Sequence, residues 1–163
     1  MHRAEYKPRH LAHATAAGLI VPPTLITNDP NAVADFAARQ PHGIITKTLY
    51  ARMPRNEEGR LSGVVYTSEV PPDRYRDPSI AATAHLFQAK LVKKTDLRVT
   101  VVGNSIFATS IDNPGELDWR RHHDTVTYRP YELPDTVVTG VRQLMRSLEL
   151  VSLKMLFFTQ PDG

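Results

Sequence analysis

Apolar residues recur at intervals of three and four in parts of the chain, and this spacing predicts short helices. The clearest is Pro134–Leu148, whose apolar positions are Val137, Val138, Val141, Leu144, Met145 and Leu148. A second helix is predicted over Pro8–Ala17, with Gly18 as its end. A third should begin at Asp29, an N-cap residue, with Pro30 in its first turn. Long helices are not expected, because 13 prolines interrupt the chain.

Short apolar runs between these helices predict strands. Gly43–Leu49 and Val64–Ser68 should form a hairpin around a long polar loop, and Leu19–Ile26 should be an extended connector or an edge strand. The strands expected in the second half are Leu86–Val92, Leu97–Val102, Ser105–Ile111, Thr125–Tyr131 and Val151–Thr159. Val102–Ser105 has the composition of a tight hairpin turn.

Two segments bear on how the chain is divided and how it ends. Val70–Pro78 is rich in proline and charge, and it is the predicted boundary between two lobes, residues 1–78 and 79–163. Met155–Phe158 is apolar on both faces, which is typical of a covered central strand, and the turn sequence Pro161–Gly163 usually leads to an antiparallel partner. We therefore expect that the chain ends within a fold or that another element covers this edge. A homodimer through this strand is one such arrangement.

Composition and charge narrow the function classes. The 163 residues fit one domain or two small subdomains, and the lack of cysteine excludes a disulfide scaffold and a Cys-ligated zinc site. No apolar run suits a membrane span and no secretory signal is visible, so we expect a cytoplasmic protein without a membrane partner. The net charge of +3 is spread over both halves, which argues against nucleic acid as a partner. The seven histidines lack metal-ligand spacing, so no metal site is predicted.

The candidate chemistry begins with a lysine on a predicted strand. Lys47 shares a strand face with Ile45 and Leu49, so it is either a lysine at a sheet edge or the partner of an anion. The neighbouring loop contains Gly59 and Gly63, and such a loop can present backbone N–H groups to phosphate oxygens.

Two further basic segments carry alternative interpretations. Arg98 lies inside an apolar strand, where its guanidinium would suit a phosphate or carboxylate, but the lysine-rich stretch before it could equally be a solvated face. Asp118–Arg121 holds the only tryptophan and is either a contact for a peptide or substrate or a cap on the core.

The order of several segments resembles the ATP-grasp ligases, and among them the maturases of microviridin-type ribosomal peptides, the graspetides. The matching stretches are KPRHLAHATAAGLIVPPTLITNDPNAVADF, GIITKTL, LFQAKLVKKTDLRVTVVGNSIFATSID, LDWRR, YRPYELP and TQPDG. Each motif is weak alone, but their shared order over nearly the whole chain is fairly specific. The resemblance implies an α+β fold of two small subdomains that hold ATP in a cleft between them, with Lys47 facing that cleft.

The resemblance also implies roles for individual residues. The cofactor-binding residues would be Lys47, Gly59, Gly63, Gln88, Lys90 and Lys93. Among these, Gln88 and Lys90 belong to Phe87–Leu91, which would form the hinge that contacts adenine through its backbone. Arg98 would act at the phosphates as the catalytic residue, and Asp118 and Arg120 would contact a precursor peptide. The family converts a side-chain carboxylate to an acyl phosphate, which an amine or hydroxyl attacks to give a lactam or lactone.

The chain also departs from the family pattern. The family has a preceding lobe, and it continues past the terminal turn into a strand whose Glu and Asn hold Mg²⁺. Ala89 and Leu156 stand where the family has acidic residues, so the recognised ligands for Mg²⁺ are absent. We therefore expect a truncated or degenerate ATP-grasp protein that neither hydrolyses ATP nor closes peptide rings alone. The alternative is a non-catalytic module that binds a nucleotide or a peptide on the same fold.

Overall fold

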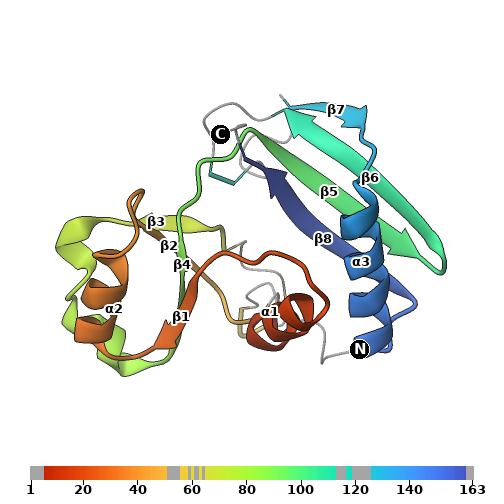
Figure 1. Cartoon of the computed structure of the whole chain (residues 1–163). Coiled ribbons are helices and arrows are strands. Elements are labelled where there is room, and N and C mark those ends of the chain that lie inside the picture. Colours follow the sequence, from red (N-terminus) through yellow and green to blue (C-terminus); the bar gives the residue numbers. More distant parts are fainter. Residues whose placement is uncertain are drawn as a thin grey trace. The chain divides into compact units, whose positions relative to one another are not determined.

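The computed structural model describes residues 6–50, 56–58, 60, 63, 65–112, 117–118 and 126–160. The chain forms two compact units, each with its own sheet (Figure 1). Unit 1 comprises Met1–Pro8 and Pro22–Leu91, and unit 2 comprises Arg9–Val21 and Val92–Gly163. The α+β class is confirmed, and no helix among the described residues has the length and apolar character of a membrane span.

Unit 1 contains a four-stranded antiparallel sheet with the order β1-β4-β2-β3. Its strands are β1 (Thr24–Thr27), β2 (Ile44–Lys47), β3 (Ser68–Val70) and β4 (His85–Ala89). The edge strand predicted within Leu19–Ile26 is confirmed as β1. The predicted hairpin also forms, but its second strand is β3 rather than Val64–Ser68. The shift follows from pairing Val70 with Ile44, which brings both residues into the core of the unit.

Helix α2 (Pro30–Ala37) covers one face of this sheet and confirms the predicted helix start. The Asp29 side chain accepts a hydrogen bond of 2.9 Å from the Asn31 backbone N–H, which satisfies one of the unpaired donors at the helix N-terminus. The helix buries Val33, Phe36 and Ala37 against Ile44, Phe87 and Ile80. Successive residues of a strand point to opposite faces, so Ile45, Lys47 and Gln88 lie on the face away from α2.

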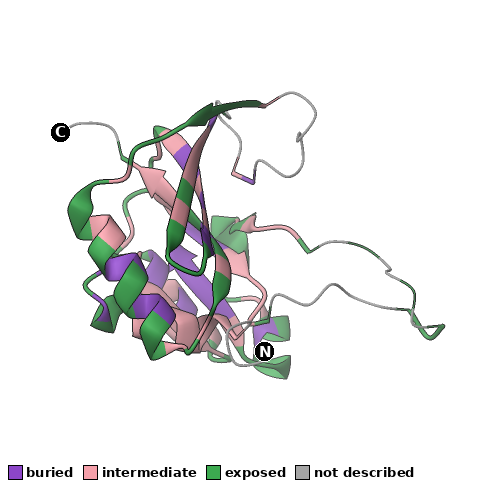
Figure 2. Cartoon of the chain, turned by 90° about the vertical axis from the view of Figure 1, so that its right-hand side faces the viewer, coloured by how far each residue is buried: buried purple, intermediate pink, exposed green. Residues whose placement is uncertain are grey.

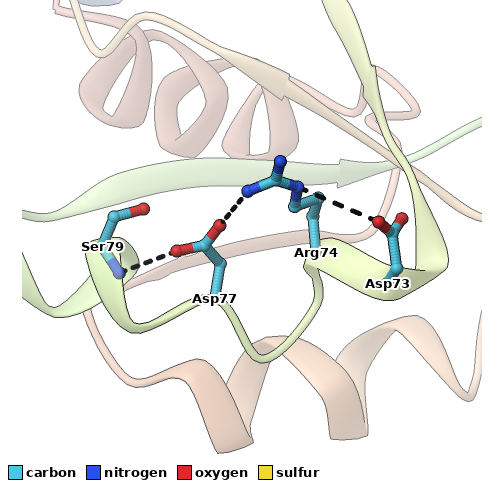
Figure 3. A network of polar contacts seen from close by, with 4 residues as sticks. All are labelled: Asp73, Arg74, Asp77 and Ser79. Carbon is cyan, nitrogen blue, oxygen red and sulfur yellow. Dashed lines mark hydrogen bonds and ion pairs between the residues drawn. The ribbon is translucent and has the colours of Figure 1, made fainter.

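The proline-rich stretch after β3 is an ordered part of unit 1. It forms the short 3₁₀ helices η2 (Pro72–Arg74) and η3 (Pro78–Ala82). The Asp77 carboxylate accepts from the Ser79 backbone N–H at 2.9 Å and from Arg74 Nη1 at 2.7 Å (Figure 3). These two bonds lower the pKa of Asp77 to about 2, the backbone N–H having the larger effect.

After β1, the chain stays in unit 1 as far as Leu91 and enters unit 2 at Val92, not at residue 79. The reason is that β4 lies between β1 and β2 and so belongs to the first sheet. That the two units act as the N-terminal and C-terminal ATP-grasp subdomains remains a prediction.

Unit 2 contains a second antiparallel sheet with the order β7-β6-β5-β8. Its strands are β5 (Thr95–Val102), β6 (Ser105–Asp112), β7 (Thr127–Pro130) and β8 (Ser152–Thr159). The predicted tight turn is confirmed by the pairing of Val102 with Ser105 and by Gly103, whose φ is +56°. β8 stands at the end of this strand order, so it has an open edge among the described residues, as expected. Its two faces are not both covered, because Met155 is buried while Leu156 on the other face is 55% exposed. Pairing of this edge with a second copy stays a prediction.

Helix α3 (Asp135–Ser147) packs on this sheet and confirms the clearest predicted helix. Its buried side carries Gly140, Val141, Leu144 and Met145, and buried and exposed residues alternate along it (Figure 2). The core of unit 2 combines these residues with the inward positions of β5 and β8 and the end of α1 (Lys7–Ala16).

Helix α1 confirms the helix predicted over Pro8–Ala17, and Gly18 ends it as expected. Gly18 has a φ of +76°, a conformation that favours glycine. The backbone N–H of Gly18 donates to Thr15 O and that of Leu19 donates to Ala14 O, each at 3.0 Å. This pair of bonds is the Schellman arrangement, and it directs Leu19 into the core of unit 2.

Candidate functional site

A chain of polar side chains crosses the sheet of unit 1 on the face away from α2. Lys47 Nζ donates to Gln88 Oε1 at 2.8 Å, and Gln88 Nε2 donates to Thr24 Oγ1 at 2.9 Å. Thr24 Oγ1 in turn donates to the Pro22 carbonyl at 2.8 Å. Gln88 is only 3% exposed, so these bonds are what stabilises its amide in the interior. The side chain of Lys47 is thereby held in one orientation on β2.

A second lysine lies on the same sheet face. Lys90 follows β4 two residues after Gln88, and its Nζ lies 2.5 Å from Glu69 Oε1. Glu69 stands opposite Ile45 in the pairing of β2 with β3, which places it on this face as well. Both side chains of the ion pair are partly solvent-exposed, so the pair contributes little to stability and can open for an anion.

The backbone N–H and C=O groups of β4 are already hydrogen-bonded within the sheet. Phe87 and Gln88 pair with β1 on one side and with β2 on the other. Ala89 pairs with Ile44 of β2 and its N–H donates to the Pro23 carbonyl, while the Lys90 N–H donates to the Gly43 carbonyl, each at 2.9 Å. By contrast, the backbone N–H and C=O groups of Leu91 and Val92 make no hydrogen bond among the described residues. Backbone contacts from the expected hinge Phe87–Leu91 are therefore possible only at its end, beyond the strand.

The remaining candidates lie in unit 2. Lys93 Nζ lies 2.6 Å from Asp96 Oδ2 and 3.1 Å from the Leu117 carbonyl oxygen. Arg98 is half-buried on β5, on the sheet face opposite to Val99 and the core around α3. Asp118 is 5% exposed, which makes it one of the most deeply buried charged residues described.

The structure thus brings Lys47 and Gln88 into contact and places Lys90 on the same face. Lys93, Arg98 and Asp118 belong to unit 2. Gly63 is exposed, with a φ of +156°, whereas Gly59 and Arg120 lie outside the described residues. Within the described ranges, no three His, Asp or Glu side chains come together as metal ligands.

Sequence reasoning missed three residues of these clusters. Thr24 and Glu69 join the cluster only through strand pairing, Thr24 being 64 residues from Gln88, and no local pattern reveals such a contact. Asp96 did have a signal, because it stands three residues after Lys93 in a stretch with three lysines.

Comparison with solved structures gives similar chains, although neither a protein-family model nor a curated protein matches the sequence. The macrocyclase MdnC of Microcystis aeruginosa MRC, solved with the precursor peptide MdnA, is 31% identical with a TM-score of 0.80, covering 98% of this chain and 50% of its own. The macrocyclase MdnB of the same organism is 26% identical with a TM-score of 0.72, covering 99% of this chain and 49% of its own.

A RiPP-associated ATP-grasp ligase of Chryseobacterium gregarium, solved with ADP and a leader and core peptide, shares the fold with a TM-score of 0.83. It is 24% identical and covers 98% of this chain and 49% of its own. The chain therefore spans about half the length of the solved structures it resembles. Over that span, it has the ATP-grasp fold and is similar to the ATP-grasp ligases that mature ribosomal peptides.

Proposed function

We propose that this chain contributes the nucleotide-binding part of an ATP-grasp ligase acting on the side-chain carboxylate of a peptide. The observation that carries the proposal is the match of 98% of the chain to MdnC, which was solved with a precursor peptide. A cytoplasmic location and a ribosomally made precursor peptide as substrate belong to the same proposal.

In unit 1, Lys47 and Lys90 would hold the phosphates of ATP. Both ammonium groups lie on one sheet face, and Gln88 fixes the direction of the first. The adenine would be recognised by the backbone groups of Leu91 and Val92, which are uncommitted among the described residues. The glycines Gly59 and Gly63 are proposed to supply N–H groups over the phosphates.

The proposed reaction has two steps. The substrate carboxylate attacks the γ-phosphorus of ATP, forming an acyl phosphate and releasing ADP, and an amine or hydroxyl then displaces phosphate to form an amide or ester. Arg98 would stabilise the negative charge that develops on the transferred phosphoryl group. Asp118 and Arg120 would orient the peptide. Mg²⁺ would neutralise phosphate charge in the parent reaction. In this chain Ala89 and Leu156 stand where the resemblance expects acidic residues, so the recognised ligands for the ion are lacking.

A non-catalytic nucleotide- or peptide-binding module is the second candidate. Ala89 and Leu156 favour it, because neither side chain can coordinate a metal or transfer a proton at positions where the resemblance expects acids. Leu156 is also more than half exposed, so its replacement of an acid is not explained by core packing. A nucleotide-binding module would share ADP binding with the ligase and differ from it only in turnover, whereas a module that binds only a peptide would bind no ADP.

Calorimetric titration of the chain with ADP tests the shared part of the proposal. Lys47→Met should weaken ADP binding by about tenfold or more, because a charge-assisted bond to phosphate is worth roughly 1.5–3 kcal/mol. Arg39→Gln, which removes an exposed cation just after α2, is the matched control and should leave the affinity within about twofold. Equal ADP affinity in Lys47→Met and the unmodified chain, or no binding at about 1 mM ADP, would contradict the proposal.

A further inference from the structure

Lys93 joins two segments of unit 2 that are distant in sequence. Its ammonium lies 2.6 Å from Asp96 Oδ2, in the first residues of β5, and donates to the carbonyl of Leu117 at 3.1 Å. Leu117 precedes Asp118, which is 5% exposed and so packed inside the unit. One side chain therefore connects the start of β5 to the segment that the proposed function places at the peptide substrate.

We propose that Lys93 is a positioning residue that holds the Leu117–Asp118 segment for the peptide, rather than a ligand of nucleotide phosphate. This inference rests on the proposed function for the identity of the segment. It differs from the role implied by the family resemblance, which places Lys93 near the nucleotide.

The burial of Asp96 is the main argument against a phosphate-binding role. Asp96 is 3% exposed, and a carboxylate in such a place needs a cation close by to remain charged. Lys93 is the cation that the structure supplies, and its own side chain is 22% exposed. Moving the ammonium to a phosphate would leave Asp96 without this partner and would break the bond to Leu117 at the same time.

The position of Lys93 in the chain links its contact with Leu117 to nucleotide binding. Lys93 directly follows Leu91 and Val92, the backbone groups proposed to recognise adenine. A rearrangement of this connector on nucleotide binding would thus reach Leu117 and Asp118 through a single side chain. Lys93 would in this way couple the nucleotide segment to the peptide segment without touching either reacting group.

Hydrogen–deuterium exchange combined with ADP calorimetry tests the inference on the full chain. Because Lys93→Met alone would leave a buried charge at Asp96, the informative variant is the double change Lys93→Met with Asp96→Asn. It should accelerate exchange in peptides that cover Leu117–Asp118 by about tenfold or more, while peptides from β5 and β6 remain as protected as before. ADP affinity should stay within about twofold of the unmodified chain.

Two matched variants separate positioning from general destabilisation. Lys93→Arg keeps the charge and the donors and should restore most of the protection at Leu117–Asp118. Lys94→Met removes the adjacent, exposed lysine and should leave exchange in that segment unchanged. Unchanged exchange at Leu117–Asp118 in the double variant would overturn the inference, and so would a loss of ADP affinity of about tenfold with normal protection. If the unmodified chain binds no ADP, the proposed function fails, whereas the exchange result still decides the positioning role.

Discussion

At the scale of single residues, the amide of Gln88 determines how Lys47 is presented. An ammonium group only donates hydrogen bonds, so the amide oxygen must face Lys47 and its nitrogen must face Thr24, as observed. The buried amide therefore has one favourable orientation, and the lysine beside it is held before any ligand arrives. Such preorganisation lowers the entropic cost of binding an anion.

A histidine of α1 makes the stability of the protein depend on pH. Burial lowers the pKa of His10 below its usual value of 6.5, and the neighbouring His13 lowers it further. The unfolded chain then binds more protons than the folded one at pH values just below 6.5, so the free energy of unfolding falls as the pH falls through this range. Above about pH 6.5 both forms are neutral at this site, and no dependence on His10 is expected.

Thermal melting at about pH 7.5 and about pH 5.5 checks this dependence. From the higher to the lower pH, the melting temperature of the unmodified chain should fall further than that of His10→Gln, whose side chain does not titrate. The loss that remains in the variant reports the other titrating groups. An identical loss in both proteins would rule out His10 as a contributor.

At the scale of elements, close packing between α1 and α3 depends on one glycine. A Cβ at Gly140 would lie 2.6 Å from Leu19 Cδ2 and 3.1 Å from the Ala17 carbonyl oxygen. Both groups are fixed, because the Schellman bonds hold the end of α1 and Leu19 is buried in the core. α3 therefore has a glycine in its interior despite the poor helix propensity of this residue, because a larger side chain would collide with Leu19 and Ala17.

Gly140→Ala should destabilise the protein by roughly 1–2 kcal/mol. Overpacking costs about 1–3 kcal/mol, and the higher helix propensity of alanine recovers at most about 1 kcal/mol. Thr139→Ala is the control, because Thr139 is exposed on the same helix and alanine there should be neutral or slightly stabilising. Urea denaturation measures both variants, and a Gly140→Ala chain as stable as the unmodified one would show that Leu19 moves aside freely.

Elements with local signals could be predicted from the sequence, and elements set by distant pairing could not. Asp29 followed by Pro30 identifies the start of α2, because the cap and its donor are two residues apart. The place of β3 depends instead on which residue meets Ile44 in the core. The boundary at Leu91 was missed for the same reason, since β4 joins unit 1 by pairing with residues that lie 39 to 64 positions away in sequence.

The candidate site shows the same limit. Lys47 could be identified because a cation between apolar strand positions is unusual. Its partners could not be predicted from the sequence, because the contact with Gln88 spans 41 residues and depends on sheet register. The role assigned to Lys93 illustrates a different difficulty, in that a lysine beside an apolar strand fits a phosphate and a buried carboxylate equally well until the burial of Asp96 is known.

At the scale of the whole molecule, the two units divide the proposed tasks. Unit 1 carries Lys47, Lys90 and Leu91, which are assigned to the nucleotide, whereas unit 2 carries Arg98 and the segment assigned to the peptide. Val92, the other residue assigned to adenine, is the first residue of unit 2 after β4. Of the points at which the chain changes unit, Leu91–Val92 is the one where adenine recognition is proposed. The central proposal is therefore that nucleotide binds on unit 1, at the sheet face that carries Lys47 and Lys90 and at the end of β4.

Amide NMR spectra of the 18.3 kDa chain during an ADP titration test that claim most directly. The backbone amides of Leu91 and Val92 and the side-chain amide of Gln88 should shift in a saturable manner, and Lys47→Met should move the midpoint of these shifts to an ADP concentration about tenfold higher or more. Amides on the far side of each sheet, such as those of α2 and α3, should move much less. Saturable shifts confined to α2, α3 or β7, or no shifts at all, would contradict the account.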